Sequence, residues 1–280
     1  MSRPGGSQGK ISQINKSAGP GDINHLMRQA ISLHQDQQFN DAIAVYRKIL
    51  MMSPGNADAL TYFGCALLEI GRASEAIDRL HEAVAADASS ADARSYLGNA
   101  LQVAGDSEGA EVAYRAALDI EPLECRTLNN LGVLLLKNNR LDEAAEFFRR
   151  GLAVDPNHVQ AHNNICQVYT KLGKIDRAIE AGRQAIEIAP RYADGHNSLG
   201  TALVRADRID DAIMSFREAL AIQPQFLDAL TNLALALINA GDSREAVEVT
   251  DVCLEVDPGN IEALATRSVA LNEIGDKGSF

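Results

Sequence analysis

A repeat of 34 residues runs along most of this 280-residue chain. Six prolines share one 34-residue grid that only Ala88 interrupts: Pro54, Pro122, Pro156, Pro190, Pro224 and Pro258. An alanine recurs on the same grid without exception, at Ala42, Ala76, Ala110, Ala144, Ala178, Ala212 and Ala246. A period of this length indicates stacked copies of one supersecondary unit rather than a single globular core.

The grid also divides the chain. Ending each repeat two residues after the proline predicts seven full repeats, at 23–56, 57–90, 91–124, 125–158, 159–192, 193–226 and 227–260. A further helix is expected at 261–275, as a cap or as a truncated eighth repeat. Residues 276–280 are expected to be a tail. Residues 1–22 are rich in Gly, Ser, Gln and Pro, so we expect a disordered tail that buries too little apolar surface to offset its ordering entropy.

Each repeat is predicted to form two helices, because apolar residues recur at spacings of three and four on both sides of a central break. Position 15 of the repeat is that break, and it holds residues that enter the left-handed region at low cost: Gly71, Gly105, Asn139, Gly173, Gly241 and Gly275. Side chains that suit the N-terminus of the second helix follow, at Asn40, Ser74, Asp106, Asp142, Asp176, Asp210 and Asp242. The proline at position 32 ends that helix.

Small residues at a fixed position predict how the two helices of a repeat touch. Position 20 is always Ala, and position 8 is Gly64, Gly98, Gly132 and Gly200, replaced elsewhere by Ala30, Cys166 and Ala234. Larger side chains at position 24 are expected to fill the space that these leave, at Tyr46, Tyr114, Phe148 and Phe216. One repeat cannot bury its apolar face alone, whereas stacked repeats can.

This pattern resembles the tetratricopeptide repeat family, most plainly in residues 128–157. The resemblance covers residues 23 to about 275. It implies an all-α fold, a right-handed α-solenoid superhelix of stacked antiparallel helix pairs. It also implies that the first helices of the repeats line a concave groove.

One side of the first helices is the candidate binding face. At roughly 100° per residue, positions 2, 5, 9, 12 and 13 share that side, with position 6 at its edge. Carboxamides recur there, and their donors and acceptors suit the backbone of an extended peptide: Asn129, Asn130, Asn163, Asn164, Asn197 and Asn232. Basic residues follow on the same face, and they favour an acidic segment or a free C-terminus as ligand: Arg126, Lys137, Lys171 and Arg205.

The row of asparagines resembles the asparagine ladder of the O-linked N-acetylglucosamine transferase repeats, which contact substrate peptides through amide side chains. Only Asn130, Asn164 and Asn232 correspond directly to that ladder, and Ser198 interrupts the row. Two alternatives stay open: the asparagines bridge neighbouring repeats, or they and the cations form a solvated face.

Composition and spacing exclude several other classes of function. The net charge of −12 argues against nucleic-acid binding, and no apolar run suits a signal peptide or a membrane span. Four cysteines without a C-x-x-C pair favour a reducing, cytoplasmic location. No nucleophile or phosphate-binding motif occurs, and His158 and His162 lack a third metal ligand nearby, so neither a cofactor nor a metal is expected.

We therefore expect a non-catalytic protein-protein interaction scaffold that binds extended peptide segments in its concave groove. A homo-oligomer is left open. The alternative is that the repeats form the N-terminal substrate-recognition arm of a larger enzyme, of the glycosyltransferase, sulfotransferase or 2-oxoglutarate oxygenase type. That alternative rests on family analogy alone.

Overall fold

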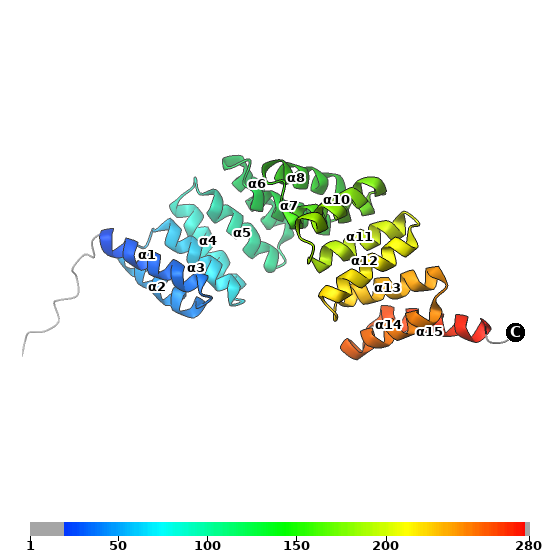
Figure 1. Ribbon diagram of the computed structural model, residues 1–280. Coiled ribbons are helices and arrows are strands. Elements are labelled where there is room, and N and C mark those ends of the chain that lie inside the picture. Colours follow the sequence, from blue (N-terminus) through cyan, green and yellow to red (C-terminus); the bar gives the residue numbers. More distant parts are fainter. Residues whose placement is uncertain (1–19, 278–280) are drawn as a thin grey trace, which may run out of the picture. The chain divides into compact units, whose positions relative to one another are not determined.

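The structure is a computed structural model that describes residues 20–277. Within this range all regular structure is α-helical, as Figure 1 shows. The helices are α1 (Pro20–Gln35), α2 (Phe39–Met52), α3 (Ala57–Glu69), α4 (Ala73–Ala86), α5 (Ala91–Val103), α6 (Ser107–Ile120), α7 (Cys125–Lys137), α8 (Leu141–Val154), α9 (Val159–Lys171), α10 (Ile175–Ile188), α11 (Ala193–Arg205), α12 (Ile209–Ile222), α13 (Leu227–Ala240), α14 (Ser243–Val256) and α15 (Ile261–Lys277).

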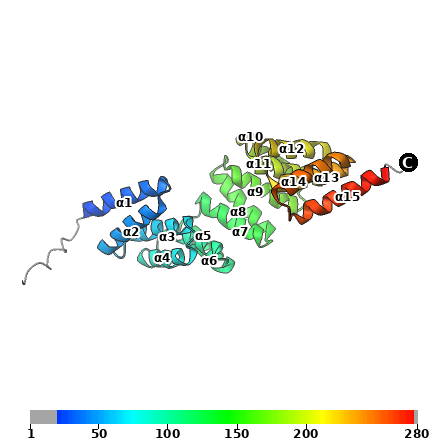
Figure 2. The same cartoon turned by 90° about the horizontal axis from the view of Figure 1, so that it is seen from below.

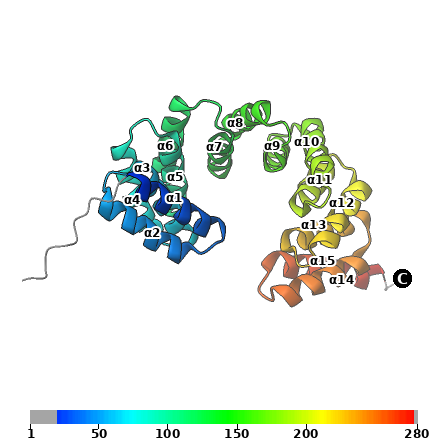
Figure 3. The same cartoon turned by 60° about the vertical axis from the view of Figure 1, so that its left-hand side comes forward.

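The chain divides into two compact units, Met1–Pro122 and Leu123–Phe280, which we call the N-terminal and C-terminal units. In both, each odd-numbered helix packs on the even-numbered helix that follows it. The first helices of successive repeats also contact each other, α1 with α3 and α5 with α3 in the N-terminal unit, and α9, α11 and α13 in turn in the C-terminal unit (Figure 3). The predicted all-α fold of stacked helix pairs is confirmed.

The core follows the repeat. All seven grid alanines are fully buried between the helices of their repeats. The glycines at position 8 let the second helix approach closely: a Cβ on Gly132 would lie 2.6 Å from Cε1 of Phe148, and one on Gly200 would lie 2.5 Å from Cε1 of Phe216. Only glycine fits such a contact, so the predicted pairing of positions 8 and 24 is confirmed.

The break between the helices also follows the prediction. Gly71, Gly105, Gly173, Gly241 and Asn139 all have positive φ, and so do Gln37 and Asp207 in the repeats that lack a glycine or asparagine at position 15. Gly275 is different, because it lies inside α15 and no helix break occurs there. Glycine permits a left-handed conformation without imposing one.

Most of the predicted capping residues were wrong. Five of the second helices begin two residues earlier than expected, so that Asn40, Ser74 and Asp142, for example, lie inside them rather than at the N-cap. Asp106 and Asp242 do lie at the N-cap, and Oδ1 of Asp106 accepts a hydrogen bond from the Gly109 amide at 2.9 Å, whereas the Asp242 side chain makes no capping bond to residues of the described range. An arginine at the N-cap pairs with an acidic residue three positions later instead, as Arg140 does with Glu143.

The predicted tails fall mostly outside the described residues. Residues 1–19 and 278–280 lie outside them, and residues 20–22 form the start of α1. The last helix, α15, ends at Lys277, two residues beyond the predicted end. It packs against α13 and α14 (Figure 2), burying Ala263, Thr266 and Ala270.

Candidate functional site

A hollow of about 360 Å³ lies in the C-terminal unit over the first helices α9, α11 and α13. Its lining residues all occupy the positions of the repeat that the sequence assigned to the candidate face. They are Gln167, Thr170 and Lys171 from α9, Asn197, Ser198, Thr201 and Arg205 from α11, and Asp228 from α13. The lining is therefore polar and charged, and it is built from three successive repeats.

Two cations that have no ionic partner in the described range lie in this hollow. Lys171 and Arg205 are exposed in the last turns of α9 and α11, and neither forms an ion pair or hydrogen bond with another residue of the described range. Asp228, in the first turn of α13, likewise has no ionic partner among residues 20–277. Two positive charges against one negative charge leave the hollow net positive, although the chain as a whole is acidic.

Carboxamides join the first helices beside the cations. Nδ2 of Asn232 donates to Oδ1 of Asn197 at 3.0 Å, and Nδ2 of Asn164 donates to Oδ1 of Asn129 at 3.2 Å. These bonds realise the alternative in which asparagines bridge neighbouring repeats. Because Oδ1 of Asn197 is occupied by Asn232, its Nδ2 is the group left to donate to a ligand in the hollow.

A second side-chain hydrogen bond orients the side of the hollow that α9 forms. Nε2 of Gln167 donates to Oγ of Ser198 at 3.4 Å, which links α9 to α11. The Oε1 atom of Gln167 is then the acceptor that this side offers. The hollow therefore presents donors, one amide acceptor and one carboxylate within a single polar surface.

The remaining predicted residues lie elsewhere. Asn163 is only 4% exposed, and its Oδ1 has no hydrogen-bond partner within the described range, so its carboxamide is withdrawn from the surface that was expected to carry it. Asn130 is half-buried on α7, and Lys137 is exposed at the end of the same helix. Arg126 is exposed, with its Nε 3.5 Å from Oε1 of Glu124.

Sequence reasoning missed five of the lining residues: Gln167, Thr170, Ser198, Thr201 and Asp228. The signal that finds them is the repeat itself, because they stand at positions 9, 12, 6, 9 and 2 of the candidate face. The predicted residues are of types that recur from repeat to repeat, whereas the residue types at these five places vary.

The cysteine next to the hollow is a packing residue. Cys166 fills the small-residue position of α9, and its thiol lies 3.6 Å from the carbonyl oxygen of Ser198. Burial raises the pKa of this thiol to about 12. A thiol that stays protonated at neutral pH is a poor nucleophile.

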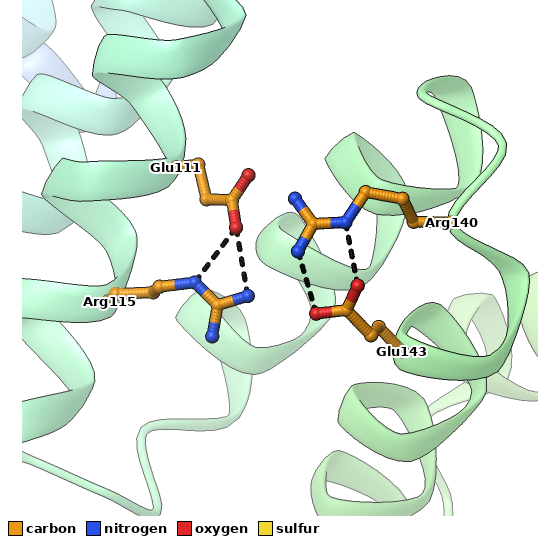
Figure 4. Close-up of polar contacts among 4 residues, drawn as sticks. All are labelled: Glu111, Arg115, Arg140 and Glu143. Atoms are coloured by element: carbon orange, nitrogen blue, oxygen red, sulfur yellow. Dashed lines mark hydrogen bonds and ion pairs between the residues drawn. The ribbon is translucent and has the colours of Figure 1, made fainter.

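Several charged residues on the second helices, or at their N-caps, form exposed ion pairs. In the N-terminal unit, Nε of Arg115 donates to Oε1 of Glu111 at 2.8 Å, and in the C-terminal unit Arg140 and Glu143 form two parallel bonds of 2.7 Å (Figure 4). Exposed pairs of this kind contribute little to stability. They contrast with Lys171 and Arg205, whose charges stay available.

Family models described as tetratricopeptide repeat match residues 33–95, 129–193 and 203–269. The chain belongs to the tetratricopeptide repeat family. Proteins of this family are in general protein-protein interaction scaffolds. A sequence search of curated proteins returns no match.

Solved structures with the same fold confirm the helix-pair stacking. A chain of the APC/C hetero-tetramer Cut9-Hcn1 matches with a TM-score of 0.74 and 18% identity, over 86% of this chain and 48% of that one. Pseudomonas aeruginosa PilF matches with a TM-score of 0.66 and 21% identity, over 76% and 96%. YrrB, a tetratricopeptide repeat protein with an unusual peptide-binding site, matches with a TM-score of 0.56 and 21% identity, over 66% and 95%. The chain thus spans about half the length of the first of these.

Two further observations concern the described residues. None of their helices combines the length and the hydropathy that crossing a bilayer requires. Nor do they bring together three or more of the side chains that commonly bind metal ions.

Proposed function

We propose that the protein is a non-catalytic scaffold whose C-terminal unit binds extended, acidic peptide segments over α9, α11 and α13. The observation that supports this proposal is the pair of cations Lys171 and Arg205, which share one polar hollow and have no ionic partner among residues 20–277. An acidic side chain or a terminal carboxylate would gain charge-assisted hydrogen bonds from both. No observation on the described residues favours the alternative of an enzyme's recognition arm.

The carboxamides would hold the peptide backbone. Nδ2 of Asn197 can donate to a peptide carbonyl, and Oε1 of Gln167 can accept from a peptide amide. Their bonds to Asn232 and Ser198 fix both groups before a ligand arrives, which lowers the ordering cost of binding. YrrB, which shares the fold, is a protein with a peptide-binding site, and this likeness supports a peptide as the ligand class.

The test is a selection from an array of random-sequence peptides with the full chain. Peptides that bind the wild type should be enriched in Asp and Glu, because the hollow carries a net positive charge. Lys171→Glu/Arg205→Glu should lower the affinity for acidic peptides roughly tenfold or more, because it reverses two exposed charges that each contribute up to about 1 kcal/mol.

A matched control changes the same number of charges outside the hollow. Arg177 and Arg183 are exposed on α10, so Arg177→Glu/Arg183→Glu should keep the acidic preference. Two results would contradict the proposal: bound peptides without acidic enrichment, and an equal loss of affinity in both double variants.

A further inference from the structure

A second hollow, of about 580 Å³, lies in the N-terminal unit between α1 and α3. Its lining comes from the same face of the first helices that lines the hollow of the C-terminal unit. It consists of Ile23, Asn24, Met27, Arg28 and Ile31 from α1, Asn56 at the N-cap of α3, and Asp58 and Tyr62 from α3. Its chemistry differs from that of the other hollow in two respects.

The first difference is an aliphatic stripe. Ile23, Met27 and Ile31 follow each other at four-residue spacing on α1, and all three are half-buried. The corresponding residues of α11, which line or border the other hollow, are Ala193, Asn197 and Thr201. Among the seven first helices of the full repeats, α1 is the one with three large apolar side chains at these positions. Methionine adapts its shape to a ligand, so this stripe suits aliphatic side chains from a bound segment.

The second difference is the sign of the charge. Residues 20–122 hold seven basic and fifteen acidic residues, a net charge of −8. Asp58 faces the hollow with no ionic partner among the described residues, and Glu69 stands at the position that Lys171 and Arg205 occupy in their repeats. Arg28 is the single cation in the lining. The unit therefore favours a basic segment, with Arg28 opposing it locally.

We propose that this hollow binds residues 10–16 of the chain itself, Lys-Ile-Ser-Gln-Ile-Asn-Lys. Residues 1–19 contain three basic residues and no acidic one. Ile11 and Ile14 would pack on the stripe of α1, and a flanking lysine would pair with Asp58. The segment's positive charge complements the net charge of −8 on residues 20–122.

The connection is long enough for this contact. Five residues, 15–19, separate Ile14 from the start of α1, and an extended chain of that length spans roughly 17 Å. The stripe from Ile23 to Ile31 is shorter, at roughly 12 Å of helix. A short tether also gives an effective concentration in the millimolar range, so contacts of modest strength suffice.

Methyl NMR of the full chain labelled at methionine tests the proposal. Met27 lies in the hollow, whereas Met51 is 79% exposed in a different hollow on α2 and serves as internal control. Ile11→Asp/Ile14→Asp should shift the Met27 methyl signal and leave the Met51 signal in place. The matched control Ser12→Asp/Gln13→Asp changes the charge equally, and we expect it to leave the Met27 signal near its wild-type position.

A synthetic peptide of residues 9–18, added to the Ile11→Asp/Ile14→Asp variant, should return the Met27 signal toward its wild-type position. Asp58→Asn in that variant should lower the affinity for the peptide about threefold, and Arg28→Gln should raise this affinity by a similar factor. An identical Met27 signal in the wild type and in Ile11→Asp/Ile14→Asp would overturn the proposal. So would a wild-type signal that moves with protein concentration, because the occupant would then belong to a second copy. No residue that lines the hollow of the C-terminal unit takes part in this contact. The two proposals are therefore tested independently.

Discussion

Nδ2 of Asn232 donates a hydrogen bond to Oδ1 of Asn197 at 3.0 Å and so joins α13 to α11. Asn164 and Asn129, also 35 residues apart, repeat this relationship between α9 and α7. Between the two pairs the pattern fails, because Ser198 stands where an asparagine would pair with Asn163. Oδ1 of Asn163 is consequently buried without a partner in the described range.

Ser198→Asn should repair this gap. Its Nδ2 would reach Oδ1 of Asn163 by the geometry that Asn164 and Asn232 already adopt, and we expect the free energy of unfolding to rise by about 1 kcal/mol. Urea unfolding followed by circular dichroism measures the change. Ser198→Ala is the control, because it supplies no donor and should not stabilise the protein. Equal effects of the two substitutions would exclude the missing bond as the cause.

Alanine substitution at two glycines of the same repeat should change the stability of the protein in opposite directions. A Cβ on Gly132 would lie 2.6 Å from Phe148, so Gly132→Ala should destabilise the protein by about 1–3 kcal/mol through overpacking. Gly151 lies inside α8, and its added Cβ would meet nothing nearer than 3.8 Å. Gly151→Ala should therefore stabilise the protein by about 0.5–1 kcal/mol through helix propensity. Thermal unfolding of both variants decides, and a loss of stability in both would contradict the assigned roles.

The stability that Glu124 contributes at the N-terminus of α7 should depend on pH. Burial opposes ionisation of this carboxyl, but hydrogen bonds from the hydroxyl and amide of Thr127, together with the nearby Arg126, hold its pKa below the usual value. A lowered pKa contributes stability above the pKa of the unfolded chain, near 4, and this contribution is lost as pH falls through the folded value.

Glu124→Gln tests this pH dependence, because glutamine keeps an acceptor and does not titrate. The wild type should exceed the variant in free energy of unfolding by about 1 kcal/mol near neutral pH. The difference should shrink at acid pH. Urea unfolding at several pH values measures it, and a difference that stays constant with pH would rule out the carboxylate.

Much of the fold was predictable because each position of the repeat occurs in seven copies, so the residue types that the fold requires there can be recognised. Alanine at position 20 and a small residue at position 8 identify the contacts between helices, because the buried helices approach each other closely there. The helix starts were less predictable. The N-cap follows Gly71 or Asn139 directly, two residues before the predicted capping residues Ser74 and Asp142, so these two residues lie inside the helices.

The site was predictable as a face but not residue by residue. Lys171, Arg205 and Asn197 lie together in the hollow as the periodicity of the first helices indicated. Periodicity does not say which side chains on that face bond to each other. Asn163 and Asn197 share position 5, yet Asn163 is buried and Asn197 lines the hollow. Asn197 accepts a hydrogen bond from Asn232 of the next repeat, whereas Ser198 stands at the corresponding place beside Asn163.

Asp228 should limit the affinity of the C-terminal hollow for acidic peptides. It is the one carboxylate in the lining and lies there with Lys171 and Arg205. Asp228→Asn removes this charge and should raise the affinity for acidic peptides roughly two- to fivefold at low salt, with a smaller gain as ionic strength rises. The matched control is Asp194→Asn, because Asp194 is exposed at the same position of α11 but does not line the hollow. Fluorescence anisotropy with a labelled acidic peptide from the array measures both variants, and a larger gain from Asp194→Asn would place the ligand outside this hollow.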